Sequence, residues 1–374
     1  MITHPGSTPS LDSEAAPGAD APGSTSREHQ QLIVGSRGSA LAMWQTRWVL
    51  DRLLEHAPHT HYHIEEISTR GDRTQALQVP LTQLGDKSMF VAELERALLA
   101  GELDVAISPM NDRSLVDAER QAMPVQEQQQ SGEIQPIDAA VHSLKDLPGK
   151  LDPRLTLAAV PPREDPRDAL ISRHGLRFAE LPVGAVVATS SLRRRAQVLH
   201  LRPDLRIVDI RGNVDTRLRK ALAPDGPDAV ILAVAGLRRL GLDGYITEIL
   251  PVDVLTPAVG QGALAVEVRA DDRRTRRLLK QLDHPPTRQA VTAERAVLAT
   301  LGGGCQVPLG AHATVAPDGE TLHLTAVVAS LDGQRLIRVE RDGPLRRPMT
   351  LGRGVARELL RRGAAQILAE IAGR

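Results

Sequence analysis

Strand-like and helix-like segments alternate along this chain between about residues 31 and 282, and this alternation constrains the fold more than any other feature of the sequence. Short apolar stretches bounded by Gly, Pro and polar residues predict buried strands. We expect strands at 31–36, 63–68, 137–143, 155–160, 183–188, 205–210, 229–233 and 263–268. Apolar residues at helical spacing predict helices at 41–54, 90–100, 192–201, 214–222, 235–240 and 273–282. Such a chain forms parallel or mixed sheets with ligand sites outside the carboxyl ends of the strands.

The pattern changes after Pro285-Pro286. Strands and helices no longer alternate, which indicates a small C-terminal α+β domain behind two α/β domains. We expect a helix at 288–301, a hairpin of strands 322–330 and 335–341 over Asp332-Gly333, and a closing helix at 354–371.

Three stretches lack the composition of a packed domain. Residues 1–30 are rich in Pro, Gly, Ser and acids without an apolar run, which predicts a disordered tail and not a signal peptide. Residues 69–87 show little periodicity and are expected to form a long loop. Residues 103–108 look like a first copy of the strand at 137–143, and the Gln-rich stretch between the two predicts an insertion at about 108–136.

Charge and composition exclude several classes of function. Lys+Arg and Asp+Glu balance at 46 each, so no net charge favours nucleic acid or an anionic membrane surface. An RNA-binding protein with Arg-rich turns is an alternative, but an aromatic content of 2% leaves few side chains for base stacking. No apolar run approaches the length of a membrane span. We therefore expect a cytoplasmic protein that binds neither nucleic acid nor membrane.

Basic residues occupy four of the predicted strand-to-helix turns. A cation at a helix N-terminus opposes the macrodipole, so each is unfavourable unless an anion offsets it. Capped helix N-termini and guanidinium groups bind carboxylates and phosphates. A solvated basic face explains any one of these residues, but several at corresponding strand ends favour a polyanionic ligand. The residues are Arg37, Lys145, the pair Arg193 and Arg194, and Arg211 with Arg217 a turn further on.

Asp146 is the acid among these bases. It could be a capping or salt-bridging aspartate, which is a common role. Its position after a strand and among cations makes it the candidate catalytic residue. Neighbouring positive charge favours the ionised carboxylate, which suits the stabilisation of a cationic intermediate better than the delivery of a proton.

Cys305 is the only cysteine in the chain, so the chain forms no intramolecular disulfide and no Cys-based metal cage. It could be a buried small hydrophobe, the usual role of an isolated cysteine. Three glycines precede it and Pro308 follows, a setting that presents a thiol rather than burying it. No base lies nearby in the sequence to activate a nucleophile, so a covalent attachment point is the alternative we favour.

Seven motifs in order along the chain resemble the hydroxymethylbilane synthase family, also called the porphobilinogen deaminase family. The resemblance runs from about residue 32 to the C-terminus. The motifs are Ser36-Arg37-Gly38-Ser39-Ala40-Leu41-Ala42, His142-Ser143-Leu144-Lys145-Asp146-Leu147-Pro148, Arg163-Glu164-Asp165-Pro166-Arg167-Asp168, Thr189-Ser190-Ser191-Leu192-Arg193-Arg194, Arg211-Gly212-Asn213-Val214, Val259-Gly260-Gln261-Gly262 and Gly303-Gly304-Cys305-Gln306-Val307-Pro308.

The resemblance implies a transferase of tetrapyrrole biosynthesis. Four porphobilinogen units would be joined head to tail with loss of ammonia on a dipyrromethane cofactor attached to Cys305, and water would release linear hydroxymethylbilane. Asp146 matches the catalytic aspartate, facing the azafulvene-like cation left when ammonia departs. No metal or nucleotide is implied, and a monomer is expected.

The resemblance also assigns binding residues. For the cofactor it implies Cys305, Ser143, Lys145, Thr189, Ser191, Arg193, Arg194, Arg211 and Arg217. For the substrate it implies Arg37, Ser39, Gln261, and Lys87 with Phe90 at the end of a mobile lid.

The fold implied is two α/β domains that resemble periplasmic binding proteins, joined by crossovers near 161–166 and 256–263, with a C-terminal α+β domain carrying the cofactor cysteine. Domain 1 would comprise 31–162 and 263–282, domain 2 would comprise 166–256, and the third domain 285–374. A ligand-binding or sensor protein on the same fold would explain the arginines but not the cysteine loop.

This sequence departs from the family pattern at a few positions. Asp215 replaces a small residue between Arg211 and Arg217, and Gln83 and Asp86 are unusual in the lid.

Overall fold

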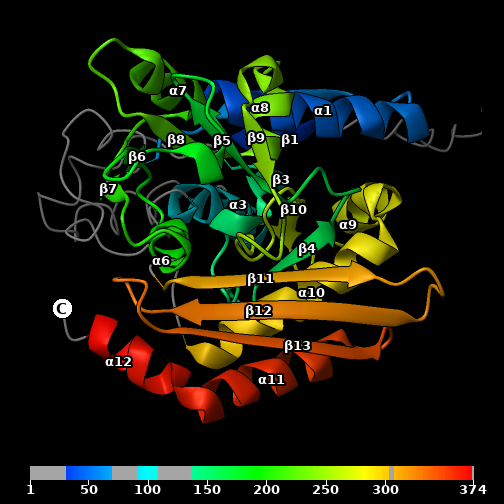
Figure 1. Ribbon diagram of the computed structural model, residues 1–374. Coiled ribbons are helices and arrows are strands. Elements are labelled where there is room, and N and C mark those ends of the chain that lie inside the picture. The colour runs from blue at the N-terminus through cyan, green and yellow to red at the C-terminus, as the bar shows by residue number, and fades with distance from the viewer. Residues whose placement is uncertain (1–30, 70–90, 108–135, 303–306, 373–374) are drawn as a thin grey trace, which may run out of the picture. The chain divides into compact units, whose positions relative to one another are not determined.

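The computed structural model describes residues 31–69, 91–107, 136–302 and 307–372, whose strands form three sheets (Figure 1). The first sheet has the order β2-β1-β3-β10-β4, the second β7-β6-β8-β5-β9 and the third β11-β12-β13. No helix in this part of the chain is long and apolar enough to cross a membrane.

In the first sheet, β1 pairs in parallel with β2 and β3, while β10 runs antiparallel to β3 and β4. Side chains alternate between the two faces of a strand. Ala139 and Val141 accordingly pack in the cluster that contains residues of α1, whereas Ala140 packs with residues of α3. The two helices therefore bury opposite faces of the sheet. The elements are β1 (Leu32–Ser36), α1 (Ala40–His56), β2 (Tyr62–Glu66), α3 (Ala92–Ile107), β3 (Ala139–Ser143), β4 (Leu155–Ala159), β10 (Leu264–Arg269) and α9 (Arg273–Leu279).

The second sheet has helices on both faces. Val198 of α6 packs in one buried cluster and Leu218 of α7 in another. Strand β5 lies between β8 and β9 and is antiparallel to both, whereas β6 is parallel to β7 and β8. The elements are β5 (Asp168–Ser172), β6 (Val186–Ala188), α6 (Leu192–Leu201), β7 (Arg206–Val208), α7 (Val214–Leu222), β8 (Ala229–Ala233), α8 (Val234–Arg239) and β9 (Glu248–Leu250).

The chain crosses between these two sheets twice. It leaves the first sheet after β4 and returns to it at β10, having formed the whole second sheet in between. Two α/β units joined by two crossovers were expected near 161–166 and 256–263, and this expectation is confirmed. The domain boundaries at individual residues stay a prediction.

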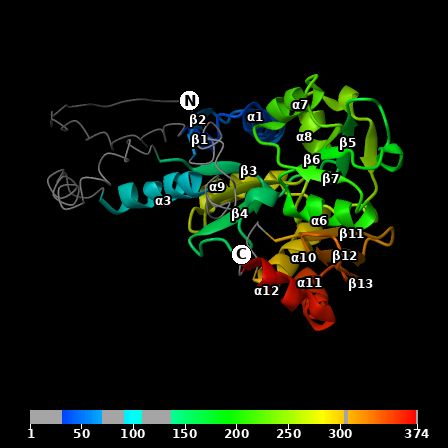
Figure 2. The same ribbon diagram turned by 60° about the vertical axis from the view of Figure 1, so that its left-hand side comes forward.

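The third sheet is an antiparallel meander packed against helices, as expected for a C-terminal α+β domain (Figure 2). Its core joins Val297 of α10, Leu324 of β12 and Val355 of α11. The elements are α10 (Pro285–Leu301), β11 (Leu309–Val315), β12 (Thr321–Ala329), β13 (Leu336–Pro344), α11 (Pro348–Leu359), the π-helical turn Leu360–Ala364 and α12 (Ala365–Ala372).

Some sequence predictions were wrong. Residues 103–107 do not form a strand, because they complete helix α3, so β3 alone holds the place beside β1. The closing helix begins at Pro348 and is interrupted at Gly363, whose φ of 104° is not helical. Three strands were not predicted, namely β5, β9 and β11. The predicted tail, the loop at 70–87 and nearly all of the insertion lie outside the described residues.

Glu294 joins the C-terminal domain to both crossover segments. Its fully buried carboxylate accepts two hydrogen bonds from Arg163, at 2.6 and 3.2 Å, and one each from the backbone N–H of Gly260 and Ala313, at 2.7 and 2.8 Å. Burial alone would raise the pKa of Glu294, but the charges of Arg163 and His312 outweigh it and lower the pKa to about 2. The ionised form is therefore the one that stabilises the fold.

We expect Glu294→Gln to cost about 3–5 kcal/mol of unfolding free energy at pH 7, because it leaves the Arg163 cation buried without its partner. The carboxylate has a pKa near 4.3 when unfolded and about 2 when folded, so its contribution is complete above pH 5 and is lost as the pH falls toward 2. Urea titrations of the wild type and of Glu294→Gln should therefore give unfolding free energies whose difference becomes smaller below pH 4.5. Glu340→Gln, at an exposed ion pair, is the control and should change little. A difference that is independent of pH would contradict this account.

Candidate functional site

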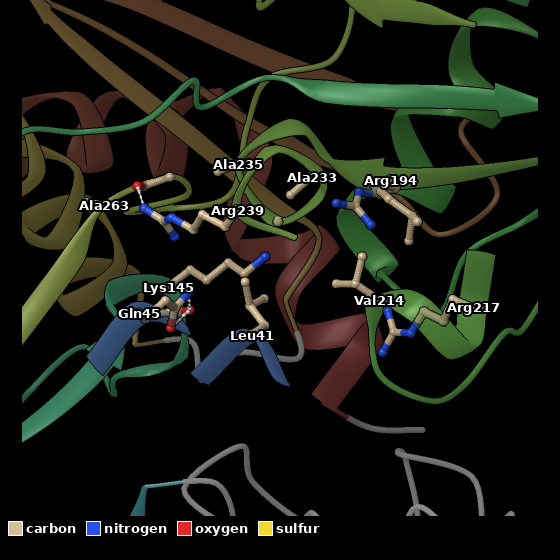
Figure 3. A pocket seen from close by; sticks show the side chains of 14 residues that line it. Leu41, Gln45, Lys145, Arg194, Val214, Arg217, Ala233, Ala235, Arg239 and Ala263 are labelled. Carbon is tan, nitrogen blue, oxygen red and sulfur yellow. Dashed lines mark hydrogen bonds between the residues drawn. The ribbon is translucent and has the colours of Figure 1, made fainter. Parts of the chain in front are cut away.

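A cavity lies between the first and second sheets at the ends of β3 and β8 (Figure 3). Basic and small side chains line it, and the cavity encloses about 70 Å³. Strand ends and the helices that follow them supply its walls, as expected for α/β folds. The lining residues are Leu41, Gln45, Ser143, Lys145, Arg194, Val214, Arg217, Leu232, Ala233, Ala235, Gly236, Arg239, Gly262 and Ala263.

The segment after β3 is held by its apolar residues. Leu144 and Leu147 are almost fully buried on either side of Lys145 and Asp146, which are half-buried in the 3-10 helix Leu144–Asp146. Gly260 packs so closely that a Cβ would lie 2.0 Å from Leu144 Cδ2, and its φ of 70° also favours glycine. The two leucines thus fix the backbone that carries the polar pair.

Ser143 exchanges hydrogen bonds with Gln45 of α1, at 2.9 and 3.2 Å. The side chain of Lys145 extends from beside this pair into the cavity (Figure 3). Ser143 and Lys145 were both expected at the site, and the structure brings them together.

Asp146 makes no hydrogen bond or ion pair with the residues that the structure describes, yet its charge acts on Arg217 of α7. Burial, with the charges of Arg194 and Arg211, lowers the pKa of Arg217 to about 10, and Asp146 opposes this lowering. Arg217 therefore stays a cation at neutral pH. It donates through Nε to the carbonyl of Gly212, at 2.7 Å, and no carboxylate of the described chain lies within ion-pair distance of it.

Arg193 and Arg194 have a different environment from the one expected. Both are buried, and both bind the fully buried carboxylate of Asp168, each at 2.7 Å. Arg193 also donates to the carbonyl of Thr256 and Arg194 to that of Ile231, each at 2.8 Å. The sequence predicted an external anion to offset these two charges, and the carboxylate of Asp168 on β5 offsets one of the two.

The Asp168 carboxylate is ionised because of this pairing. Burial raises its pKa, but the two guanidinium charges outweigh burial and hold the pKa well below its usual range. Gln261 takes part as well, since its buried amide donates to Asp168 at 2.8 Å and to the carbonyl of Pro166 at 2.6 Å. Gln261 was expected to bind substrate. In the structure its amide holds the carboxylate of Asp168 in place.

Thr189 and Ser191 shape the start of α6. Ser191 is the N-cap and accepts a hydrogen bond from the N–H of Arg194, while Thr189 is buried and accepts one from the N–H of Ser191. In the same way Ser39 caps α1 by accepting from Ala42. Both helices therefore begin at a serine that caps them.

Arg239 is the lining residue that sequence reasoning missed. It is buried on α8, donates to the carbonyl of Gly262 at 2.7 Å, and has no carboxylate within ion-pair distance in the described part of the chain. Burial lowers its pKa to about 10, with Glu164 opposing. The sequence patterns single out the basic residues in the strand-to-helix turns, whereas Arg239 is the last residue of α8.

The remaining predicted residues are not all placed. Arg37 lies half-buried in the turn between β1 and α1, and Arg211 lies half-buried in the turn before α7. Lys87, Phe90 and Cys305 lie outside the described residues, as do Gln83 and Asp86.

The donor set suits a ligand that carries several carboxylates. Arg217 and Arg239 are cations without carboxylate partners among the described residues, Lys145 adds an ammonium group, and Ser143 adds a hydroxyl. A dipyrromethane bears acetate and propionate groups, so the chemistry fits. The cavity volume of about 70 Å³ is smaller than the roughly 300–1,000 Å³ of pockets that hold drug-sized ligands.

Two models of one protein family match most of the chain. The family model described as porphobilinogen deaminase, dipyromethane cofactor binding domain, matches residues 32–125 and 110–277, two segments that overlap within the predicted insertion. The model for the C-terminal domain of porphobilinogen deaminase matches residues 288–361.

Curated relatives match nearly the whole chain. The porphobilinogen deaminase of Brevibacillus brevis is 46% identical over 90% of this chain and 96% of its own length. That of Roseiflexus sp. is 47% identical over 91% of this chain and 99% of its own length. Among solved structures, the methionine-binding protein MetQ is 12% identical, covers 73% of this chain and 95% of its own, and has a TM-score of 0.36, too low to carry an argument. On the family models and the curated relatives, the chain belongs to the porphobilinogen deaminase family.

Proposed function

We propose that this protein joins four porphobilinogen molecules head to tail into linear hydroxymethylbilane and releases one ammonia per molecule joined. One observation carries the proposal beyond family membership. The charge of Asp146 acts on Arg217 in a cavity whose charged lining residues are Lys145, Arg194, Arg217 and Arg239. Arg217 and Arg239 have no carboxylate within ion-pair distance in the described chain. Such a site binds a carboxylated substrate and tolerates positive charge on it at one point.

The cations hold the substrate by its carboxylates. Porphobilinogen carries an acetate and a propionate, and guanidinium groups bind carboxylates through two parallel hydrogen bonds. We assign this role to Arg217 and Arg239, with Lys145 and Arg211 beside them. Arg193 and Arg194 share the carboxylate of Asp168, which offsets one of their two charges, and Arg194 also lines the cavity.

Asp146 acts on the reacting carbon. When the aminomethyl C–N bond of porphobilinogen breaks, ammonia leaves with the electron pair and the substrate carbon becomes positively charged. A cavity lined by cations would oppose that charge. The Asp146 carboxylate offsets it, and a preorganised opposite charge in a partly buried site is the strongest means a protein has of doing so.

A dipyrromethane group attached to Cys305 would supply the free pyrrole carbon to which the first substrate molecule is joined. Residues 32–125 and 110–277 match the model of the domain that binds this cofactor. Ser143, Lys145 and Arg217 are the described residues that we propose to contact it. The thioether linkage to Cys305 belongs to the proposal and is tested separately.

Two measurements test this proposal, namely the intact mass of the purified protein and its turnover of porphobilinogen. The purified protein should exceed its sequence mass by two linked pyrrole units, and on addition of porphobilinogen it should release ammonia and form a linear tetrapyrrole. Porphobilinogen binding without ammonia release would favour a ligand-binding or sensor protein, and the absence of both would overturn the proposal.

The proposal includes a monomer at work in the cytoplasm. Sedimentation of the cofactor-loaded protein should give the mass of one chain, 40.4 kDa plus the cofactor.

A further inference from the structure

The only two tryptophans of the chain stack on each other on α1. Trp44 and Trp48 are four residues apart, so they share one face of the helix, with ring centroids 6.4 Å apart and planes inclined by 16°. The guanidinium of Arg239 lies over Trp44 at 5.9 Å and that of Arg52 over Trp48 at 5.6 Å. The side chains of Arg52, Trp48, Trp44 and Arg239 thus form a row that runs from α1 to α8. Arg239, at the end of this row, lines the cavity.

The position of the Arg239 side chain depends on its contact with Trp44 in this row. Its one hydrogen bond to the described chain, to the carbonyl of Gly262, holds a single nitrogen. The guanidinium of Arg239, which is buried, lies over the ring of Trp44, and a guanidinium is attracted to the face of an indole. An arginine held by one hydrogen bond alone keeps much of its rotamer freedom and loses it on binding a ligand.

Trp44 itself is not needed as core. It is 36% exposed, and it is not among the residues that form the buried cluster between α1 and the first sheet, whereas Val49, Leu50 and Leu53 are. This large aromatic residue, in a chain with 2% aromatic residues, makes a cation-π contact with Arg239.

We propose that Trp44 is a positioning residue for substrate binding, which holds the Arg239 guanidinium from α8 against α1 so that its free N–H groups face a carboxylate of porphobilinogen in the cavity. This inference rests on the proposed function and adds to it a residue that touches neither substrate nor cofactor. It also makes one wall of the carboxylate site depend on a contact between the two α/β units.

Steady-state kinetics of the cofactor-loaded protein separate positioning from a structural role. Trp44→Leu should raise KM for porphobilinogen about tenfold and leave kcat within about twofold. Trp44→Phe keeps an aromatic face and should recover most of the loss. Trp48→Leu removes the stacking partner of Trp44 and a side chain packed against the core, but no contact with Arg239, and should leave KM within about twofold even if it lowers the melting temperature.

A double-mutant cycle decides whether the effect runs through Arg239. Arg239→Gln alone should raise KM, and adding Trp44→Leu to it should raise KM no further. A tenfold effect of Trp44→Leu that persists in the Arg239→Gln background would overturn the proposal. So would a lowered melting temperature with unchanged KM, or an equal effect of Trp48→Leu.

Tryptophan fluorescence needs no turnover, so it tests the role of Trp44 separately from the proposed function. In a Trp48→Phe protein Trp44 is the sole tryptophan, and Arg239→Gln should shift its fluorescence emission by removing the cation from its ring. If wild-type protein releases no ammonia, the proposed function fails. If it does and the emission does not respond to Arg239→Gln, the positioning role fails alone.

Discussion

Replacing Asp146 by Asn is expected to slow ammonia release at least about a hundredfold while the protein keeps its fold and its affinity for porphobilinogen. The amide is nearly isosteric with the carboxylate but brings no charge to the substrate carbon as the C–N bond breaks, and the loss of one preorganised group of this kind costs on the order of 3 kcal/mol in the barrier. Rapid-quench measurement of a single turnover reports that step directly.

The charges around Asp146 also predict how Asp146→Asn changes KM. Asp146 opposes the field of Arg194 and Arg211 at Arg217, so its neutralisation makes the cavity more positive. Substrate carboxylates should then bind as tightly as before or more tightly, and KM should not rise. A raised KM with unchanged single-turnover rate would show that Asp146 serves binding and not the reacting carbon.

The matched control is Asp271→Asn. Asp271 is an exposed aspartate that, like Asp146, follows a strand of the first sheet. The same chemical change there should leave both kinetic constants and the melting temperature near wild type.

Hydrophobic periodicity and capping signals predicted most helices of the two α/β units. They failed where the structure of a segment depends on its pairing with a distant strand. Helices α6 and α7 begin and end at the predicted residues because capping and periodicity are local signals. Asp104-Val105-Ala106-Ile107 and Asp138-Ala139-Ala140-Val141 look alike, yet only the second finds β1 and β10 as partners. The first continues a helix already established by the preceding residues. Propensity over a few residues cannot distinguish the two.

The same limit applies to the site. The cationic turns were visible in the sequence, and two of their residues, Lys145 and Arg217, line the cavity. Their binding roles stay a prediction. What the sequence could not show is which cations have internal partners. Asp168 lies 25 residues before Arg193 and reaches it only because β5 and the start of α6 meet in the folded sheet. Arg239 escaped notice for the converse reason, since the fold alone leaves its charge without a carboxylate among the described residues.

Replacing Cys305 by Ser is expected to remove the covalently bound pyrrole mass and nearly all activity. Helix α10 ends at Gly302, whose φ of 70° turns the chain out of the helix three residues before the cysteine. A serine hydroxyl is a far weaker nucleophile than a thiolate and does not form the linkage under the same assembly conditions. The variant should also melt at a lower temperature, because a group bound only by the folded protein stabilises it.

The single cysteine makes the attachment countable in wild-type protein as well. In denaturant, a thiol reagent should label less than a tenth of a cofactor-loaded sample, because the sulfur is occupied, and one thiol per chain in any cofactor-free sample. Cys305→Ala serves as the second variant, since it tests whether the serine oxygen contributes anything. Full activity and added mass in either variant would place the attachment elsewhere. A fully reactive thiol in active wild-type protein would show that the cofactor is held without a covalent bond, by the cations of the cavity alone.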